Sequence, residues 1–339
     1  MKHFLILLFC LSFTASASKQ LHKTGRAIDD HGPKFDPIIS ANFLVLYDHS
    51  QILKESNGFK IQEILLQFGA TVDKLFEAEV FLGIEQLEDR EKFDVFPIGV
   101  FGETRKIKNL NFRAGQFLNH FGEHNARYKH NFPFILAPLI NQEMFGERGL
   151  NFIGLGIDWK SLFNNTGEIT FEITQGKNHE LFEDFENHYL ANFRYWGHWE
   201  FENDHNLKVG LSGAVAEVER GLWGVDLNYN HILAPNHNFN FRFEYMGKIK
   251  HKRQGLYSHL KYQFYKEWEL SYRYDYTGLE KERIDPISQK HSIMISALPT
   301  YFSGVRLEYS YLKRGDGISD NRVLFQINQT IGPRRAHSY

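Results

Sequence analysis

The sequence predicts an all-β protein, a transmembrane antiparallel β-barrel of about 16 strands. Three observations support this prediction. Strand-length runs alternate apolar and polar residues, the N-terminus resembles a signal peptide, and no later apolar stretch reaches the roughly 18 residues that a spanning helix needs. If the chain enters a membrane, it therefore does so with strands.

The alternation is clearest in residues 238–245, where every second residue is aromatic and the residues between are polar or charged. Residues 268–276 and 305–311 repeat the pattern. Because successive side chains of a strand point to opposite faces, each run has one apolar and one polar face. An apolar outside and a polar inside are typical of outer-membrane barrels. We expect the lipid to be faced by Phe241, Tyr272 and Leu307, and the lumen by Arg242, Arg273 and Glu308.

The N-terminal residues 1–17 are expected to be a secretory signal peptide. Lys2 precedes an apolar run over residues 4–13, and Ala15-Ser-Ala17 fits a cleavage site between small residues. The alternative is a buried N-terminal helix. Cys10 is the single cysteine and lies inside this segment, so the mature chain would have no disulfide and no thiolate ligand. Residues 18–36 would form a short polar lead and residues 37–339 the barrel.

Sixteen strands are expected in the mature chain, joined by connections of alternating length. After even-numbered strands the connections are mostly short, and after odd-numbered strands they are mostly longer and charged. This parity suits short periplasmic turns, longer outer loops and a periplasmic N-terminus. The expected strands are 38–47, 59–69, 71–84, 93–101, 107–117, 149–159, 167–175, 187–199, 206–215, 221–231, 238–247, 254–265, 267–277, 289–297, 302–312 and 321–331.

The polar faces predict a lumen of mixed charge. Opposite signs alternate along single strands, and we expect neighbouring strands to pair them, which leaves little net field and weak ion selectivity. The alternative is that these residues only brace a water-filled wall. The expected pore-lining residues are Arg113, Glu172, Arg194, Lys208, Asp226, Arg242, Glu244, Lys261, Arg273, Asp275, Arg306 and Glu308.

The longest connection, residues 118–147, is expected outside and contains an apolar segment over residues 131–140. Two prolines there argue against a ladder strand. An apolar segment is unfavourable in open water, so it could enter the lumen as a constriction or pack across the barrel mouth. It could equally cover a neighbouring loop or a subunit contact. The expected constriction residues are Phe132, Phe134, Ile135 and Leu136.

The same connection carries His120, His124 and His130. Imidazole is a good zinc ligand, and one loop can bring three histidines together, but their spacing matches no defined zinc motif. We therefore expect no cofactor and keep zinc at these histidines as the alternative.

The chain resembles a family of diderm outer-membrane proteins described as porins or as zinc-regulated TonB-dependent receptors. The resemblance begins with 37–40, 58–63 and 70–76, and ends with 331–339. It is strongest in the middle, at residues 113–117, Phe121-Gly122, Asn125, His130, Pro133-Phe134, Pro138, 146–150, Gly154 and Trp159. It implies an outer-membrane barrel without a settled substrate, and its name associates zinc with the family. A TonB-dependent receptor needs a plug inside about 22 strands, and residues 18–36 leave no room for one.

The predicted function is a porin-like channel for passive diffusion of small solutes or ions across the bacterial outer membrane. Expected partners are outer-membrane lipid, small solutes and the barrel-assembly machinery, with a homotrimer by analogy. The net charge of -2 suggests no nucleic acid. A zinc-linked uptake barrel, a lipid hydrolase and an adhesin are alternatives. No His-x-Ser sequence offers a serine and a histidine on one strand face, so we expect no enzyme.

Overall fold

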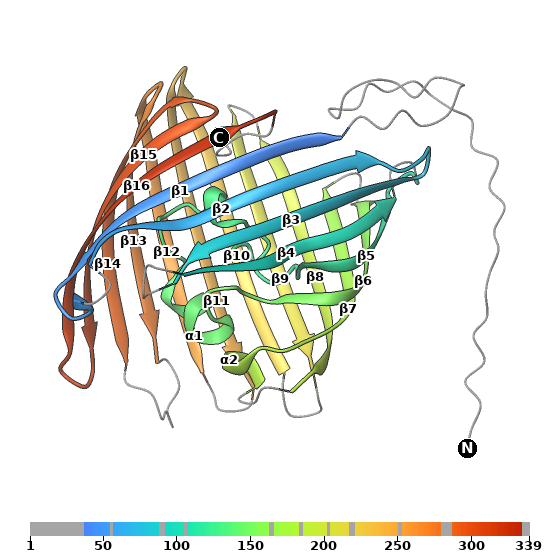
Figure 1. The fold of residues 1–339 in the computed structure, drawn as a ribbon, viewed down its shortest axis with the longest axis horizontal. Coiled ribbons are helices and arrows are strands. Elements are labelled where there is room, and N and C mark those ends of the chain that lie inside the picture. Colours follow the sequence, from blue (N-terminus) through green and yellow to red (C-terminus); the bar gives the residue numbers. More distant parts are fainter. Residues whose placement is uncertain are drawn as a thin grey trace.

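Sixteen antiparallel strands form one closed barrel in the computed structural model (Figure 1). Each strand pairs with its neighbours in sequence, and β1 pairs with β16 to close the sheet. The structure describes residues 37–54, 57–87, 92–104, 107–162, 166–182, 186–201, 204–216, 221–249, 253–278 and 287–333. The predicted fold class is confirmed, whereas the signal peptide and the polar lead lie outside the described residues.

The strands lie close to their predicted positions. Their bounds are β1 Ile38–Ser50, β2 Gly58–Thr71, β3 Phe76–Gln86, β4 Phe93–Thr104, β5 Leu110–Leu118, β6 Asn151–Leu162, β7 Gly167–Gly176, β8 His188–Phe201, β9 His205–Val215, β10 Gly221–Ala234, β11 His237–Lys248, β12 Gln254–Tyr265, β13 Trp268–Thr277, β14 Ser288–Thr300, β15 Ser303–Arg314 and β16 Ser319–Ile331.

The turn between β2 and β3 was predicted wrongly. We expected it at residues 69–70, but β2 runs on to Thr71 and β3 begins only at Phe76. The cause is Asp73, whose Oδ1 accepts hydrogen bonds from the backbone N–H groups of Leu75 (2.6 Å) and Phe76 (2.8 Å). This local side-chain to backbone pairing fixes the turn four residues later than the sequence pattern indicated.

The connections mostly alternate in length as predicted, although only four residues join β15 to β16. Only two to four residues separate β2 from β3, β8 from β9, β10 from β11, β12 from β13 and β14 from β15. In two of these turns Asp204 (φ 62°) and Asn236 (φ 64°) adopt the left-handed conformation, which these residue types tolerate. The opposite end carries the longer connections, including α2 (His179–Phe182) between β7 and β8. The described residues contain no helix long and apolar enough to cross a membrane.

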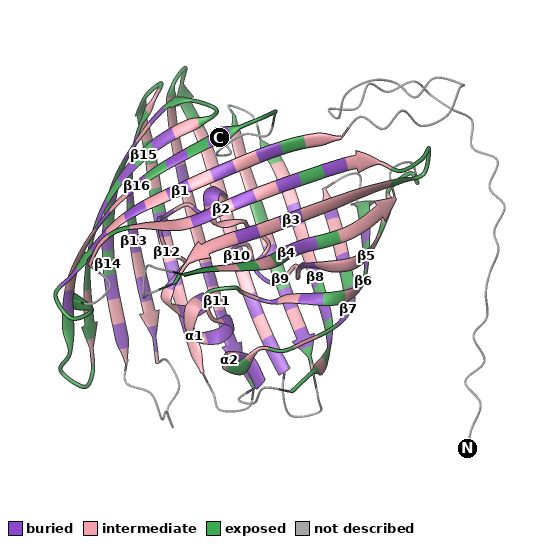
Figure 2. Ribbon diagram, in the orientation of Figure 1, coloured by how far each residue is buried: buried purple, intermediate pink, exposed green. Residues whose placement is uncertain are grey.

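The two faces of the strands differ as the alternation predicts. Outside, Tyr272 and Leu307 are 40% and 48% exposed, whereas their inward neighbours Arg273 and Glu308 are 2% and 0% exposed. Figure 2 shows the resulting alternation of buried and more exposed residues along the strands. The inward residues are buried by protein, because the connection between β5 and β6 fills part of the lumen. This connection, residues 119–150, is called the long loop below.

The long loop contains the short helices η2 (Lys129–Asn131) and α1 (Leu139–Phe145). Figure 1 shows α1 within the outline of the barrel. The core of the protein consists of three apolar clusters, and each combines long-loop residues with residues of the wall or of its connections. The lumen therefore holds the hydrophobic core.

Candidate functional site: the lumen and its long loop

Carboxylates of the wall hold the long loop by its backbone. Glu172 on β7 accepts from the N–H of His120 (3.0 Å), and Glu244 on β11 from that of His124 (3.3 Å). Further along the loop, Asp275 on β13 accepts from the N–H of Leu139 (3.0 Å), and Glu308 on β15 from that of Ile135 (3.2 Å). These four carboxylates come from strands far apart around the barrel, so the loop is attached across the lumen.

Wall side chains also donate to the carbonyl groups of the long loop. Arg306 donates to the carbonyl of Phe132 (2.9 Å), and Arg273 donates to that of Leu136 (2.8 Å). Two amides do the same, with Asn192 bonded to His120 (2.8 Å) and Asn328 to His130 (3.1 Å). Backbone groups of a loop buried in protein require such partners, because water does not reach them there.

Apolar contacts add to these hydrogen bonds. Phe134 and Ile135 of the long loop pack with Leu46, Met294 and Leu324, which project inward from β1, β14 and β16. Both loop side chains are 1% exposed. The segment that we predicted to be a constriction thus lies inside the barrel, against the wall opposite the loop's own strands.

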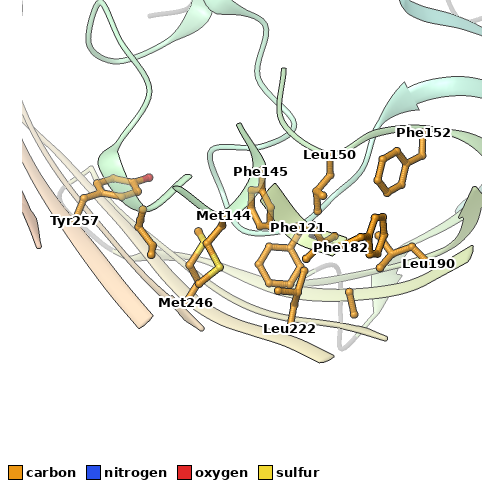
Figure 3. Close-up of a cluster of buried hydrophobic side chains, with 13 residues drawn as sticks. Phe121, Met144, Phe145, Leu150, Phe152, Phe182, Leu190, Leu222, Met246 and Tyr257 are labelled. Atoms are coloured by element: carbon orange, nitrogen blue, oxygen red, sulfur yellow. The ribbon is translucent and has the colours of Figure 1, made fainter. Parts of the chain in front are cut away.

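The largest cluster lies between the long loop and the strands from β6 to β12 (Figure 3). Phe121, Met144 and Phe145 of the loop gather above Leu222 and Met246 of the wall in this view. The two rings Phe121 and Phe145 meet edge to face, with centroids 5.6 Å apart. Leu181 and Phe182 of α2 join the same cluster, so a second connection helps to hold the loop.

Gly122 is where the loop backbone comes closest to the wall. It adopts φ 63°, and a Cβ atom there would lie 1.7 Å from Oε1 of Glu244. The N–H of Gly122 also donates to the hydroxyl of Ser212 on β9 (3.0 Å). Only glycine fits both the conformation and the space. The pattern of apolar and polar residues in the sequence gives no sign of this role.

The strand register arranges the inward charges in rows. Arg242, His259 and Arg273 lie side by side on β11, β12 and β13. Two residues further along β11, Glu244 lies beside Asp226 of β10. At these positions, directly opposite residues on neighbouring strands do not pair unlike charges.

Unlike charges meet in other directions. Arg273 pairs with Asp275 along its own strand, with Nε and Oδ2 2.8 Å apart. Arg194 on β8 reaches across β9 to Asp226 on β10 (2.9 Å). The glycine between them makes this possible, since a Cβ on Gly210 would lie 2.3 Å from the Asp226 carboxylate. These four charges are therefore compensated within the protein.

The remaining predicted pore-lining residues are nearer the end with the short turns. Lys261 pairs with Glu269 on the neighbouring strand (2.7 Å), and Arg113 lies 3.2 Å from Asp158. Lys208 is exposed, and its ammonium lies 5.2 Å from the centre of the Trp196 ring. Solvent thus reaches Lys208, whereas the long loop covers the charges nearer the other end.

At the wall, Glu123 of the long loop is half-buried and His124 is buried. Burial alone would raise the pKa of Glu123, but Arg127 and Arg242, with hydrogen bonds from Arg127 and Asn228, lower it to about 2. Burial lowers the pKa of His124 to about 3, helped by the positive charges of Arg127 and Arg273. Glu123 is therefore charged and His124 neutral at neutral pH.

The structure does not bring the three predicted zinc ligands together. His120 bonds to Glu172 (2.7 Å), His124 packs on Phe132, and His130 stacks on Tyr128. Among the described residues, no group of three or more histidine, cysteine or acidic side chains is placed to hold a metal ion. A zinc site at these histidines stays a prediction without geometric support in this arrangement.

Solved structures with the same fold are outer membrane proteins. An anion-selective porin from Comamonas acidovorans aligns with a TM-score of 0.62 at 9% identity, covering 88% of this chain and 100% of the porin. The outer membrane channel DcaP of Acinetobacter baumannii aligns at 0.59 and 10%, covering 89% and 99%. OmpT of Vibrio cholerae, in a trimer form, aligns at 0.57 and 9%, covering 88% and 99%.

These likenesses show the fold, a 16-stranded barrel of the porin type. The sequence itself matches no protein-family model and no curated protein sequence. The strand number also excludes the barrel of a TonB-dependent receptor, which has about 22 strands. The receptor half of the family name is therefore not supported.

Proposed function

We propose that this protein is a porin-like channel of the bacterial outer membrane, through which small solutes or ions diffuse passively. The observation that carries the proposal is the closed barrel with an apolar outer face and a charged inner face, in which one long loop is fixed across the lumen. The fold shared with channels supports it. The long loop acts as the constriction.

The mixed-sign wall favours weak ion selectivity. Arg194 is compensated by Asp226 and Arg273 by Asp275, so neither sign dominates the lumen. The purified protein in a planar bilayer should give conductance steps, and a salt gradient should give a reversal potential well short of the ideal value for either ion. A silent bilayer would contradict the channel and point to a filled barrel, as in an enzyme or an adhesin.

Removal of residues 131–140 tests the constriction. This deletion takes away Phe134 and Ile135 and returns Arg306 and Glu308 to solvent. Single-channel conductance should rise, while the barrel still migrates as a folded band on unheated gels. Unchanged conductance in a folded deletion variant would show that the segment only covers other parts of the protein.

A homotrimer is part of the proposal. Its support is the fold and the trimer form of one protein that shares it. The mass of the protein–detergent complex at several protein concentrations decides this point, since a monomer at all of them would exclude the trimer.

A further inference from the structure

A hollow lies between the long loop and the wall formed by β2, β3 and β4. It encloses about 560 Å³ of space that no atom fills, part of it open to solvent. Glu63 and Phe96 line it from the wall, and His124, Phe132 and Asn141 line it from the loop. Its enclosed part is about 50 Å³, which is room for a small polar group rather than for a large ligand.

Three of the residues that line this hollow have buried polar atoms without hydrogen-bond partners. They are Oε1 of Glu63, Nε2 of His124, and both Oδ1 and Nδ2 of Asn141. The three residues are only 1%, 5% and 4% exposed. A buried polar atom without a partner costs about 1–3 kcal/mol, so three such groups around one hollow indicate that something else bonds to them.

The unpartnered atoms are mainly acceptors. A carboxylate oxygen and an amide oxygen accept hydrogen bonds, and a neutral imidazole has one accepting nitrogen. The basic residues that line the hollow already have partners, since Lys129 pairs with Glu85 and Arg127 with Glu123. The third, Arg148, pairs with Asp94 and lies 3.8 Å from the centre of the Phe96 ring.

Aromatic side chains complete the lining. Phe132 and Phe145 both border the hollow, and Phe132 packs against the His124 ring with centroids 4.4 Å apart. The face of an aromatic ring attracts a cation, more strongly where water is excluded. A buried carboxylate, accepting amide and imidazole groups, and aromatic rings together suit a cation that donates several hydrogen bonds.

We propose that the hollow binds a small organic cation carrying a guanidinium or ammonium group, which donates to Glu63 and Asn141 and lies against Phe132. This inference rests on the proposed function only in placing such cations among the solutes that enter the barrel. Binding itself is independent of conduction.

The test compares two probes of nearly equal shape, methylguanidinium and neutral methylurea, by calorimetric titration of the full-length barrel in detergent. Methylguanidinium should bind at least tenfold more tightly than methylurea. The Glu63→Gln variant should lose at least tenfold in affinity for the cation, and Asn141→Leu should weaken it. Glu168→Gln is the matched control, because Glu168 also faces the lumen, from β7, but does not line the hollow.

Equal binding of the two probes, or wild-type affinity in Glu63→Gln, would overturn the proposal. Absence of any binding would overturn it too, and would mean that the polar atoms bond only to water. Asn141→Leu supports the test if Glu63→Gln fails to fold, since Asn141 has no side-chain partner in the described part of the chain.

Bilayer recordings separate this inference from the proposed function. In a conducting protein, methylguanidinium should produce brief blockades in the wild type and few in Glu63→Gln. Calorimetric binding together with a silent bilayer would refute the channel and leave the binding site standing. Conductance steps without binding of methylguanidinium would support the channel and refute the binding site.

Discussion

Acidification should release the long loop from the wall, because His124 is buried there as a neutral imidazole. Its ring packs on Phe132, and the positive Arg127, Arg242 and Arg273 lie nearby, with Glu123 as the opposing charge. Its backbone N–H is held by Glu244. Protonation would place a cation among these arginines, so the docked loop resists it.

The direction follows from the two pKa values of His124. The pKa of His124 is about 3 when the loop is docked and 6.5 when the histidine is in water. Above pH 6.5 His124 is neutral in both states and adds no pH dependence to docking. Below 6.5 only the released loop takes up the proton, so docking weakens by about 1.4 kcal/mol per pH unit until pH falls to about 3. Between pH 6.5 and 4.5 this amounts to roughly a 50-fold change in the ratio of docked to released loop.

Glu123 acts in a lower pH range. Burial opposes the change, but Arg127 and Arg242 lower the pKa of Glu123 from 4.5 to about 2, so its contribution to docking is complete above pH 4.5 and is lost between 4.5 and 2. Measurements between pH 7.5 and 4.5 therefore isolate the histidine from Glu123. The assay is single-channel conductance, together with protease cleavage of the long loop in detergent, and both should increase on acidification.

The matched variant is His124→Phe, which keeps a ring against Phe132 and removes the titrating group. Its conductance and cleavage should change little between pH 7.5 and 4.5. If wild type and variant respond to pH equally, the buried histidine is not the cause and the reasoning fails.

Three further predictions concern the loop, the faces of the wall and zinc. Gly122→Ala should displace the loop from the wall and raise conductance, because the added Cβ would overlap the Glu244 carboxylate. Gly317→Ala is the control: Gly317 has φ 89° and no atom within 4 Å of the added Cβ, so the substitution should cost only backbone strain of about 1 kcal/mol. Phe241→Arg should destabilise the barrel by about 2–4 kcal/mol, and Arg242→Gln by much less, as judged by folding into lipid; equal damage would refute the assigned faces. Zinc should leave conductance unchanged in the wild type and in a variant with alanine at all three loop histidines, because these side chains have separate partners; a response confined to the wild type would show that they assemble around the metal.

The strands could be predicted because the alternation of apolar and polar residues is visible within each short segment. The alternation around Phe241 and Tyr272 gives the faces directly, and the number and order of strands follow from the spacing of such runs. The start of β3 was missed because the Asp73 side chain, and not the apolar pattern, ends the turn. Even this error is confined to a few residues.

The arrangement of the lumen was much less predictable. Arg273 and Glu308 were predicted to face inward and the segment around Phe134 to form a possible constriction, and all three lie in the lumen. The contact between Arg273 and the carbonyl of Leu136, which are 137 residues apart, could not be predicted. Such contacts depend on the register of the strands and on the path of a loop without a repeating pattern. Neither leaves a signal in a single sequence.

The way in which the long loop is attached has a consequence for how freely it can change. Glu172, Glu244, Asp275 and Glu308 bind N–H groups that every residue except proline possesses. Replacing most loop side chains leaves these bonds in place, whereas losing a wall carboxylate removes one outright. The position of the loop is thus determined largely by residues of the barrel wall. A designer could therefore rewrite much of the loop to alter what passes, provided that Gly122 and the four acidic positions are kept.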